Sequence, residues 1–410
     1  MPNLPDTEKS YWREAYITSL YPKLAEDLEV DAVIVGAGIT GLTTAYLLKQ
    51  SGLRVAVLEK RTVGAGTTGR TTGKVTSQHN LIYADLQRRL GREKARLYGE
   101  ANQAAIKQIN DIITAEKISC GWQREDNYVY TADAEQVARF KQEAVVAAEL
   151  GLPATFVNTT PLPFGIKGAV RFTDQATMHP IRYLQGLAAA VHGDGSYVFE
   201  NSTVTSIQDG KPGSVKTKVG SVSAKDIVVA TNVPTLPLMA RGGYCLLEYP
   251  TQSYIVAGEP EKEFAGMYIS PDEHHYSILP VTMNGARLLL VGGESNISGL
   301  GGNKEARYSR LAQYAEKHFG VTTIDYKWSD RDYLAYDGIP LVGKLYPWSE
   351  HLYVATAFMK WGLSNGTVAA MILRDLIRSE QNEWAVTFNS NRLKPIASIP
   401  RVAAKYILPG

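Results

Sequence analysis

Three glycines near the N-terminus have the spacing of a dinucleotide-binding turn. Gly36, Gly38 and Gly41 occupy the G-x-G-x-x-G positions between an apolar run, residues 31–35, and a predicted helix that begins near Ile39. The first glycine permits a tight turn, the second lets the backbone approach a pyrophosphate, and the third lets helix and strand pack closely. The unpaired N–H groups and partial positive charge of the helix N-terminus would then hold the phosphates.

A carboxylate follows where a ribose diol is expected. Residues 54–58 predict a second strand, and Glu59 lies at its end, at the usual distance from the glycines. An acid at this place accepts hydrogen bonds from ribose hydroxyls and repels a 2′-phosphate. The alternative is an ordinary glycine-rich turn between a strand and a helix. Because strand, turn, helix, second strand and acid occur in order, the sequence favours a dinucleotide site, which the motif alone leaves open between FAD and NAD.

The next segment, residues 61–79, predicts a loop that wraps phosphate. It is rich in glycine, threonine and cations, so that backbone N–H groups and hydroxyls supply donors at close range. Besides the three glycines and Glu59, the residues that we expect to contact the cofactor here are Ile39, Thr40, Lys60, Arg61, Thr67, Thr68, Arg70, Thr71, Thr72 and Gly73.

Three later segments also have distinctive sequences. Asp226–Pro234 reads as a buried strand that ends in Ala-Thr-Asn, Tyr336–Gly343 contains Asp-Gly-Ile-Pro-Leu-Val-Gly, and Leu352–Gly366 reads as a strand, a turn and a helix. Together with the loop, these segments resemble the flavin-dependent amine and amino-acid oxidases of the glycine oxidase, sarcosine oxidase and D-amino-acid oxidase group. The resemblance implies that the cofactor is FAD and that it also contacts Val204, Ala230, Thr231, Asn232, Trp361, Gly362 and Leu363.

The turn in the last of these segments departs from the family pattern. The usual Gly-His-Gly reads Met359-Lys360-Trp361 here, so Lys360 replaces a residue that normally has no charge. This turn, Ser10–Trp12 and Trp328–Tyr333 resemble the branch whose members often carry a C-terminal Rieske iron–sulfur domain. A Rieske cluster needs two cysteines and two histidines, and the sequence contains no such paired spacing. We therefore expect a Rieske-free relative, or a fragment of a longer Rieske-containing protein.

The composition favours an enzyme that acts on small molecules. The chain has 410 residues with 43 basic and 41 acidic side chains, and a formal net charge of +2 gives no reason to expect nucleic acid or an anionic membrane as a partner. No apolar run reaches the length of a spanning helix or of a signal-peptide core, so we expect a cytoplasmic protein. The two cysteines, Cys120 and Cys245, are expected to be small core residues.

Hydrophobic periodicity predicts an α/β fold with two discontinuous domains. Residues 1–85, 160–245 and 325–410 are expected to form a Rossmann-like FAD-binding domain. Residues 86–159 and 246–324 are expected to form a second, α+β substrate domain built on an antiparallel sheet. The pattern places helices at 85–118, 133–150, 181–191 and 305–318, and strands at 127–131, 197–207, 214–218, 227–230 and repeatedly within 249–293.

Candidate substrate residues come from the resemblance. Arg331 lies near the position from which some relatives aim an arginine at the substrate carboxylate, and a bidentate guanidinium suits that anion. The alternative is a surface arginine paired with Asp330 or Asp332. Lys74 and His79 follow the phosphate loop, where some relatives have cationic groups near the flavin.

Two further candidates are less specific. Tyr276 follows His274-His275 and is expected to point into the cavity, the alternative being a core tyrosine with a satisfied hydroxyl. Adjacent residues of a strand face opposite ways, so we expect no metal at the two histidines. Lys360 and Lys74 are expected to place charge near the reduced flavin.

The resemblance implies an enzyme that transfers a hydride from the carbon beside an amine nitrogen to flavin N5, giving an imine that water hydrolyses. The expected partners are a small amine or amino acid and O2. The alternative is a flavoprotein dehydrogenase or electron-transfer component that passes electrons to a protein or iron–sulfur partner. We expect non-covalent flavin, because no cysteine lies in a flavin-facing segment and His79 is the only nearby attachment point.

Overall fold

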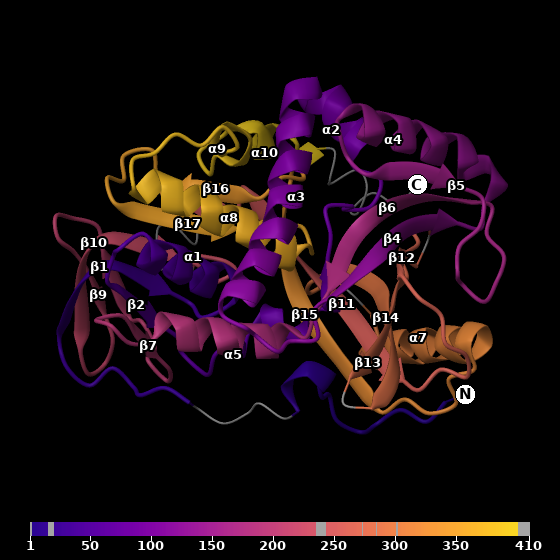
Figure 1. The fold of residues 1–410 in the computed structure, drawn as a ribbon, viewed down its shortest axis with the longest axis horizontal. Helices are drawn as coiled ribbons and strands as arrows, with labels where there is room; N and C mark the ends of the chain where they lie inside the picture. The colour runs from indigo at the N-terminus through magenta and orange to yellow at the C-terminus, as the bar shows by residue number, and fades with distance from the viewer. Residues whose placement is uncertain are drawn as a thin grey trace.

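The computed structural model describes residues 2–14, 20–234, 243–272, 274–283, 285–300 and 302–400. Its strands form one sheet of eight strands and another of nine. The two sheets lie beside each other, and helix α3 (Arg92–Ala115) stands at their boundary (Figure 1). The predicted α/β class, with a Rossmann-like part and an antiparallel part, is confirmed.

The eight-stranded sheet has a parallel centre with the order β7-β2-β1-β10-β17. The chain passes from β1 to β2 and β7 on one side, and later to β10 and β17 on the other. A crevice therefore opens between the carboxyl ends of β1 and β10, the place where such sheets bind dinucleotides. The strands are β1 (Leu28–Val35), β2 (Val55–Leu58), β7 (Tyr197–Phe199), β10 (Ser221–Val229) and β17 (Leu352–Thr356), with β8 (Ser206–Gln208), β9 (Gly213–Lys216) and β16 (Leu341–Lys344) antiparallel beside them.

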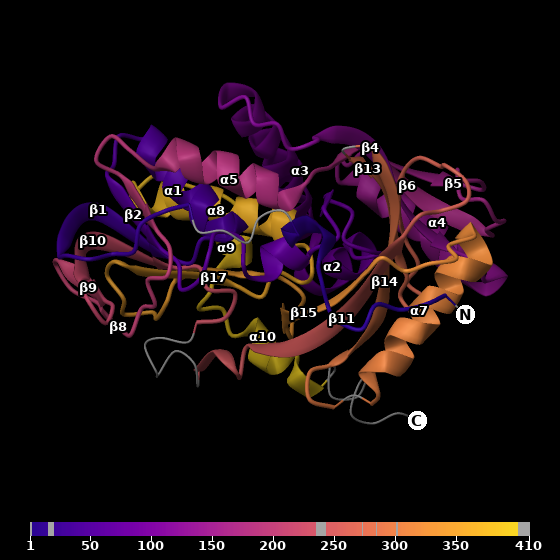
Figure 2. The ribbon, with the colours of Figure 1, turned by 90° about the horizontal axis from the view of Figure 1, so that it is seen from below.

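Burial explains why the central strands are continuous apolar runs. All four side chains of β2, Val-Ala-Val-Leu, are buried, as expected for a parallel strand that is covered on both faces. One face packs against α1 (Ile39–Gln50), α5 (Pro180–Val191) and α8 (Gly362–Ile377), which lie together above the sheet in Figure 2. The other face packs against side chains of β8, β9 and connecting segments, including Leu24, Ile207, Val215, Tyr244 and Leu345.

The nine-stranded sheet is antiparallel except where β12 runs parallel to β4. Its order is β15-β11-β14-β13-β12-β4-β6-β3, with β5 beside β6. Helix α7 (Lys304–Phe319) packs against β11 and β14, whereas α2 (Tyr83–Leu90) and α4 (Val137–Glu149) lie at the β5 and β6 end. The strands are β3 (Lys74–Val75), β4 (Gln123–Thr131), β5 (Ala154–Val157), β6 (Gly168–Thr177), β11 (Glu248–Gly258), β12 (Met267–Ile269), β13 (Ser277–Met283), β14 (Ala286–Ile297) and β15 (Tyr326–Ala335).

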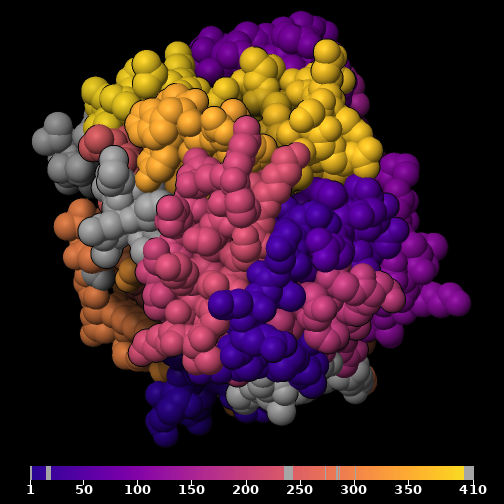
Figure 3. Space-filling model, turned by 90° about the vertical axis from the view of Figure 1, so that its left-hand side faces the viewer, coloured from indigo at the N-terminus to yellow at the C-terminus, as the bar shows by residue number. Residues whose placement is uncertain are grey.

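Three strands cross the predicted domain boundaries. Strands β3, β6 and β15 fall within the segments expected to bind FAD, yet their hydrogen bonds place them in the nine-stranded sheet. Local periodicity identifies a strand but carries no information about its partner, and pairing here depends on residues far away in sequence. The predicted division of the chain otherwise stays a prediction. Segments distant in sequence do meet on one face, where N-terminal, central and C-terminal parts lie side by side (Figure 3).

Two smaller predictions are corrected. The strand predicted over 197–207 is interrupted, because β7 ends at Phe199 and the next strand, β8, pairs with β9 instead. Cys120 is buried as expected, whereas Cys245 is exposed. Asn284, within the region 249–293 where repeated strands are expected, lies outside the described residues. Within the described part of the chain, no helix has the length and apolar character required to cross a membrane.

Candidate functional site

The glycine-rich turn follows β1 and leads into α1. Gly36 has φ +110°, and a Cβ built there would lie 2.6 Å from the carbonyl oxygen of Ala230 in the segment after β10. A Cβ on Gly41 would lie 1.9 Å from the oxygen of Gly36. Gly38 differs, since its Cβ would meet only the Thr68 hydroxyl, at 3.2 Å. The outer glycines therefore serve packing, and the middle one leaves the backbone open toward a ligand.

The acid at the end of β2 is held toward this turn. One oxygen of Glu59 accepts from the backbone N–H of Ala37 at 3.0 Å, and the other accepts from that of Arg61 at 2.9 Å. A carboxylate offers about four acceptor sites, so acceptor capacity remains for ribose hydroxyls. In the first turn of α1, the buried Thr40 hydroxyl has no hydrogen-bond partner in the described part of the chain. A buried polar atom of this kind fits a site that is completed by a cofactor.

One cavity of about 2160 Å³ joins this turn to the nine-stranded sheet. Small-molecule pockets usually measure roughly 300–1,000 Å³, so the cavity has room for a dinucleotide and a substrate. Two predicted cofactor residues, Gly41 and Gly73, do not line it; a Cβ on Gly73, where φ is +92°, would lie 2.9 Å from the Met178 oxygen. The others do: Gly36, Gly38, Ile39, Thr40, Glu59, Lys60, Arg61, Thr67, Thr68, Arg70, Thr71, Thr72, Val204, Ala230, Thr231, Asn232, Trp361, Gly362 and Leu363.

At the other end of the cavity, the unexpected Lys360 is held by hydroxyls. Its Nζ donates to Ser253 Oγ at 3.1 Å and to Ser295 Oγ at 2.7 Å, from β11 and β14. Met359 and Lys360 have φ of +57° and +69°, a left-handed turn that is uncommon outside glycine. Asp332 from β15 lines the same cavity; burial raises its pKa to about 6, against the lowering effect of the Lys360 charge. A cation and a carboxyl group therefore share this end.

Lys74 is the second lysine of the cavity and has a different environment. It is 6% exposed, and its Nζ donates to the Tyr268 carbonyl at 2.6 Å and to Ser277 Oγ at 2.8 Å. Burial lowers the pKa of this amine well below its usual value. Burial therefore favours the neutral amine, which has a lone pair that can accept a proton.

His79 is buried and neutral. Burial lowers the pKa of its ring to about 3. Its Nε2 lies 2.8 Å from the Thr76 carbonyl, which can only accept, so Nε2 carries the proton and Nδ1 accepts from the Tyr98 hydroxyl at 2.6 Å. The ring stacks on Trp361 with centroids 4.8 Å apart. His79 therefore positions Trp361, and its nitrogens are already engaged.

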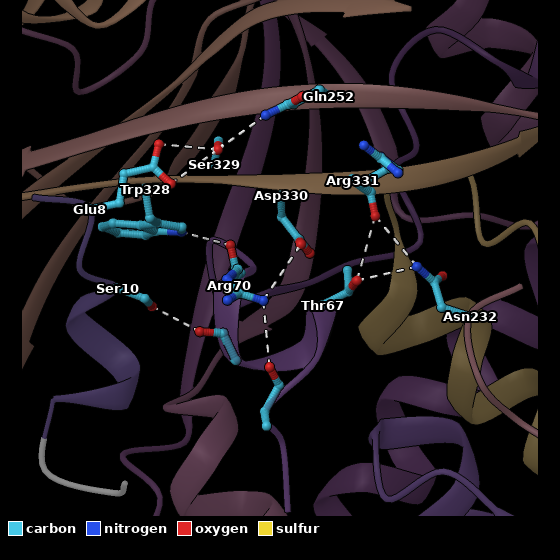
Figure 4. Close-up of polar contacts among 12 residues, drawn as sticks. Glu8, Ser10, Thr67, Arg70, Asn232, Gln252, Trp328, Ser329, Asp330 and Arg331 are labelled. Carbon is cyan, nitrogen blue, oxygen red and sulfur yellow. Dashed lines mark hydrogen bonds and ion pairs between the residues drawn. The ribbon is translucent and has the colours of Figure 1, made fainter. Parts of the chain in front are cut away.

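Arg331 and Tyr276 are the other two predicted substrate residues, and Arg331 is among the residues that line the cavity. The carbonyl of Arg331 accepts from Asn232 Nδ2 at 3.4 Å, while its exposed guanidinium points to the opposite side of β15 from Asp330 (Figure 4). No ion pair joins it to Asp330 or Asp332 in the described part of the chain. Tyr276 does not line the cavity, and its ring stacks on Tyr314 with centroids 3.6 Å apart. Strand alternation explains the orientation of Arg331 within β15, whereas Tyr276 lies just before β13 begins at Ser277.

Metal binding at the paired histidines receives no support from their contacts. His274 Nδ1 lies 3.0 Å from a carboxylate oxygen of Glu294, which also pairs with Arg310. Among the described residues, no cluster of three or more histidine, cysteine or acidic side chains has a metal-binding arrangement.

The polar residues of the cavity that sequence reasoning missed include the partners of the two lysines. Ser253, Ser277, Ser295 and Asp332 come from four different strands of one sheet. Single serines on strands carry no spacing signal, and only the strand pairing brings them to the two lysines.

The comparisons with known proteins agree with this geometry. Residues 31–376 match the DAO family, described as FAD dependent oxidoreductase. The chain belongs to this family. It is therefore an enzyme with FAD as its cofactor, and the predicted resemblance is confirmed. The Rossmann crevice, the open Gly38 and the unpartnered Thr40 hydroxyl fit that cofactor.

Members of the DAO family and solved structures resemble the chain over most of its length. It is 34% identical to the putative Rieske 2Fe-2S iron-sulfur protein YhfW of Bacillus subtilis (strain 168), over 99% of this chain and 81% of that protein. It is 24% identical to gamma-glutamylputrescine oxidoreductase of Escherichia coli (strain K12), over 92% and 90%. Its fold is similar to that of glycine oxidase from Geobacillus kaustophilus, with a TM-score of 0.75 and 19% identity over 89% of this chain and 99% of that one.

Proposed function

We propose that the protein oxidises the C–N bond of a small amine or amino acid to an imine, with O2 as the electron acceptor. The family supports the flavin chemistry, and the names gamma-glutamylputrescine oxidoreductase and glycine oxidase, carried by a relative and a structural neighbour, support this substrate class. The observation that carries the proposal is the placement of Lys360, Asp332 and Lys74 in the cavity that also receives the cofactor loop.

Lys360 is the group proposed to bind a substrate carboxylate. Its ammonium group donates to two hydroxyls of the cavity wall, which hold it at a defined place in the cavity. One of the Ser253 and Ser295 hydroxyls donates to the other across 3.1 Å, which leaves one hydroxyl proton that a carboxylate can accept. Asp332 faces the same space and suits the ammonium end of an amino acid or a second cationic group.

Lys74 is the group proposed to receive the proton of the substrate ammonium. Only a free amine has the nitrogen lone pair that assists hydride loss from the neighbouring carbon, so the proton must leave first. Lys74 lines the cavity, and burial lowers its pKa, which suits an amine that accepts a proton. The electron pair and hydrogen that leave the carbon are taken up by bound FAD, which supplies the redox chemistry. Water then converts the imine to a carbonyl compound and an amine or ammonia.

Two further features support the rest of the proposal. Helix α8 begins at Gly362 on the cavity wall, so its unpaired amides suit negative charge near a reduced cofactor. A cation such as Lys360 also stabilises charge on oxygen as it accepts electrons. The engaged nitrogens of His79 support non-covalent FAD.

A second candidate function is electron transfer to an iron–sulfur partner instead of O2. The similarity to a protein named as a putative Rieske iron–sulfur protein favours it. In both cases the reductive half of the reaction is the same, and only the electron acceptor differs.

Stopped-flow mixing in two halves tests the proposal. A panel of small amines and amino acids is mixed anaerobically with the FAD-loaded protein, and at least one compound should bleach the flavin absorbance. Air should then restore the absorbance quickly and form peroxide. If no compound bleaches the flavin, the proposed substrate class is wrong. Slow recovery in air, with rapid recovery from an artificial one-electron dye, would favour the electron-transfer candidate.

A further inference from the structure

The first residues of the chain lie against the cofactor loop, although they precede the βαβ unit. The 3-10 helix η1 (Tyr11–Arg13) comes before β1, which begins at Leu28. Trp12 has no exposed surface, and it packs in one apolar cluster with Trp328 from β15, which is 1% exposed. Two tryptophans that are far apart in sequence therefore lie in one apolar cluster beside the loop that contains η2 (Thr67–Arg70).

Three side chains from this side donate hydrogen bonds to successive carbonyls of the loop. Ser10 Oγ donates to the Gly69 carbonyl at 2.8 Å, and Trp12 Nε1 donates to that of Thr71 at 2.6 Å. Between them, Trp328 Nε1 donates to the Arg70 carbonyl at 2.7 Å. Figure 4 shows Ser10 and Trp328 pointing at the loop. The carbonyls of Gly69, Arg70 and Thr71 therefore point toward the side of the loop where the two tryptophans lie.

Fixing these carbonyls also fixes the amides that follow them. In a planar trans peptide, the C=O and N–H groups point in opposite directions. The N–H groups of Thr71 and Thr72 therefore point away from the tryptophans, whereas that of Arg70, the last residue of η2, bonds within the 3-10 helix. All three residues line the cofactor cavity, on the other side of the loop. Backbone amides that converge in this way suit oxygen acceptors.

Positive charge gathers at the same loop. The Arg13 side chain approaches Gly69 so closely that a Cβ there would lie 3.1 Å from Arg13 Cδ. Burial, followed by the like charges of Arg70 and Arg61, lowers the pKa of the Arg13 guanidinium. Asp330 offsets part of the repulsion among these three cations, since its carboxylate lies 3.9 Å from an Arg70 nitrogen, and an anionic ligand such as the diphosphate of FAD would offset more of it.

We propose that Ser10, Trp12 and Trp328 are positioning residues for the cofactor, which hold the end of η2 and the residues after it so that the backbone amides of Thr71 and Thr72 face the cofactor site. They touch the loop and not the cofactor. Without them, the loop samples other conformations. The apparent affinity for FAD then falls in proportion to the fraction of molecules whose loop remains able to bind. The proposal rests on the cofactor and is independent of the substrate and the electron acceptor.

Tryptophan-to-phenylalanine variants separate the indole N–H from the ring. Trp12→Phe and Trp328→Phe each keep an aromatic ring in the apolar cluster and remove one donor. The loss of one such hydrogen bond should raise the dissociation constant of FAD about three- to tenfold. Trp122→Phe is the matched control, because the buried Trp122 Nε1 has no hydrogen-bond partner in the described part of the chain. This control should leave the dissociation constant unchanged.

The measurement is a titration of flavin-free protein with FAD, followed by flavin fluorescence, beside the thermal midpoint of each apoprotein. The proposal expects weaker FAD binding in Trp12→Phe and Trp328→Phe than in Trp122→Phe at similar apoprotein midpoints. Dissociation constants within about twofold of the control would overturn it. Ser10→Ala and Ser10→Thr extend the test if a tryptophan variant does not fold. Alanine should weaken FAD binding and threonine, which keeps the hydroxyl, should restore it; equal affinities of this pair would also overturn the proposal.

Discussion

The two ends of the cavity are built in different ways. At the cofactor end, backbone groups and glycines determine the shape, and neighbouring side chains such as Glu59 and Trp328 hold the backbone in place. At the substrate end, charged side chains are held by hydroxyls that project from strands, as with Lys360 between Ser253 and Ser295. The first arrangement recognises a constant ligand by main-chain contacts. In the second arrangement, one or two substitutions on the same sheet are enough to change which ligand the cavity prefers.

The predictions below test this contrast, starting with the backbone. Gly38→Val should abolish FAD binding, because the side chain would fill the space through which the backbone approaches the diphosphate. The dissociation constant should rise about 100-fold or more, and purified protein should be colourless. A Cβ at Gly38 meets only the Thr68 hydroxyl, so the fold should persist, as circular dichroism would show.

Gly165→Ala is the control for this substitution, because a Cβ there meets no atom within 4 Å. It should leave the protein yellow. A Gly38→Val protein that retained FAD at wild-type affinity would show that the open backbone is not the binding surface.

At the substrate end, Lys74→Met should have the largest effect. It keeps the length of the side chain and removes the proposed proton acceptor, so substrate-dependent flavin reduction should slow about 10²–10⁴-fold at neutral pH. Because burial lowers the pKa of Lys74, the wild-type rate should fall only when acid protonates the amine. In the Lys74→Met variant, the rate of flavin reduction should no longer fall in acid. An unchanged pH profile would assign the proton to another acceptor.

Lys360→Met should discriminate between substrates. Loss of a charge-assisted pair should lower kcat/KM for an amino acid by about 2–4 kcal/mol of transition-state stabilisation, while a simple amine without a carboxylate should be little affected. The simple amine is the internal control, because it uses the same cofactor and the same Lys74. Equal losses for both compounds would contradict carboxylate binding at Lys360.

Asp332→Asn should change stability with a defined pH dependence. The folded-state pKa of Asp332, about 6, lies above the unfolded value, so the folded protein binds this proton more tightly. The carboxyl group therefore destabilises the fold progressively as the pH rises from about 4 to 6. At pH 7 the variant should be more stable by about 1–2 kcal/mol, given that the side chain is partly exposed, and this gain should vanish below about pH 4. Urea unfolding at both pH values measures the difference; a gain that persists in acid would mean that ionisation is not its cause.

The same contrast explains what could be predicted from the sequence. The turn at Gly36, Gly38 and Gly41 is local, and its order with β2 and Glu59 determines the crevice before any tertiary contact is known. The sheet that holds Lys360 depends on pairing between β11, β14 and β15, which lie far apart in the chain. No spacing rule connects a lysine in a turn to serines on two such strands. The contacts of Ser10 and Trp12 with the cofactor loop also join residues far apart in sequence, so no spacing rule predicts them. The resemblance of Ser10–Trp12 to one branch of the family indicates a relationship but no contact.

The smallest effect is expected at the residue that the sequence favoured most for the substrate carboxylate. Arg331→Ala should change kcat/KM for amino acids less than about twofold, within the usual ±0.5 kcal/mol of a surface substitution. The reason is its orientation: the carbonyl of Arg331 contacts Asn232, and the guanidinium points to the other side of β15 (Figure 4). Parallel kinetics of Arg331→Ala and Lys360→Met with one amino acid therefore decide which cation serves the substrate. A large loss in Arg331→Ala and a small one in Lys360→Met would require the exposed guanidinium to swing into the cavity when substrate binds, and would reverse the assignment made from the structure.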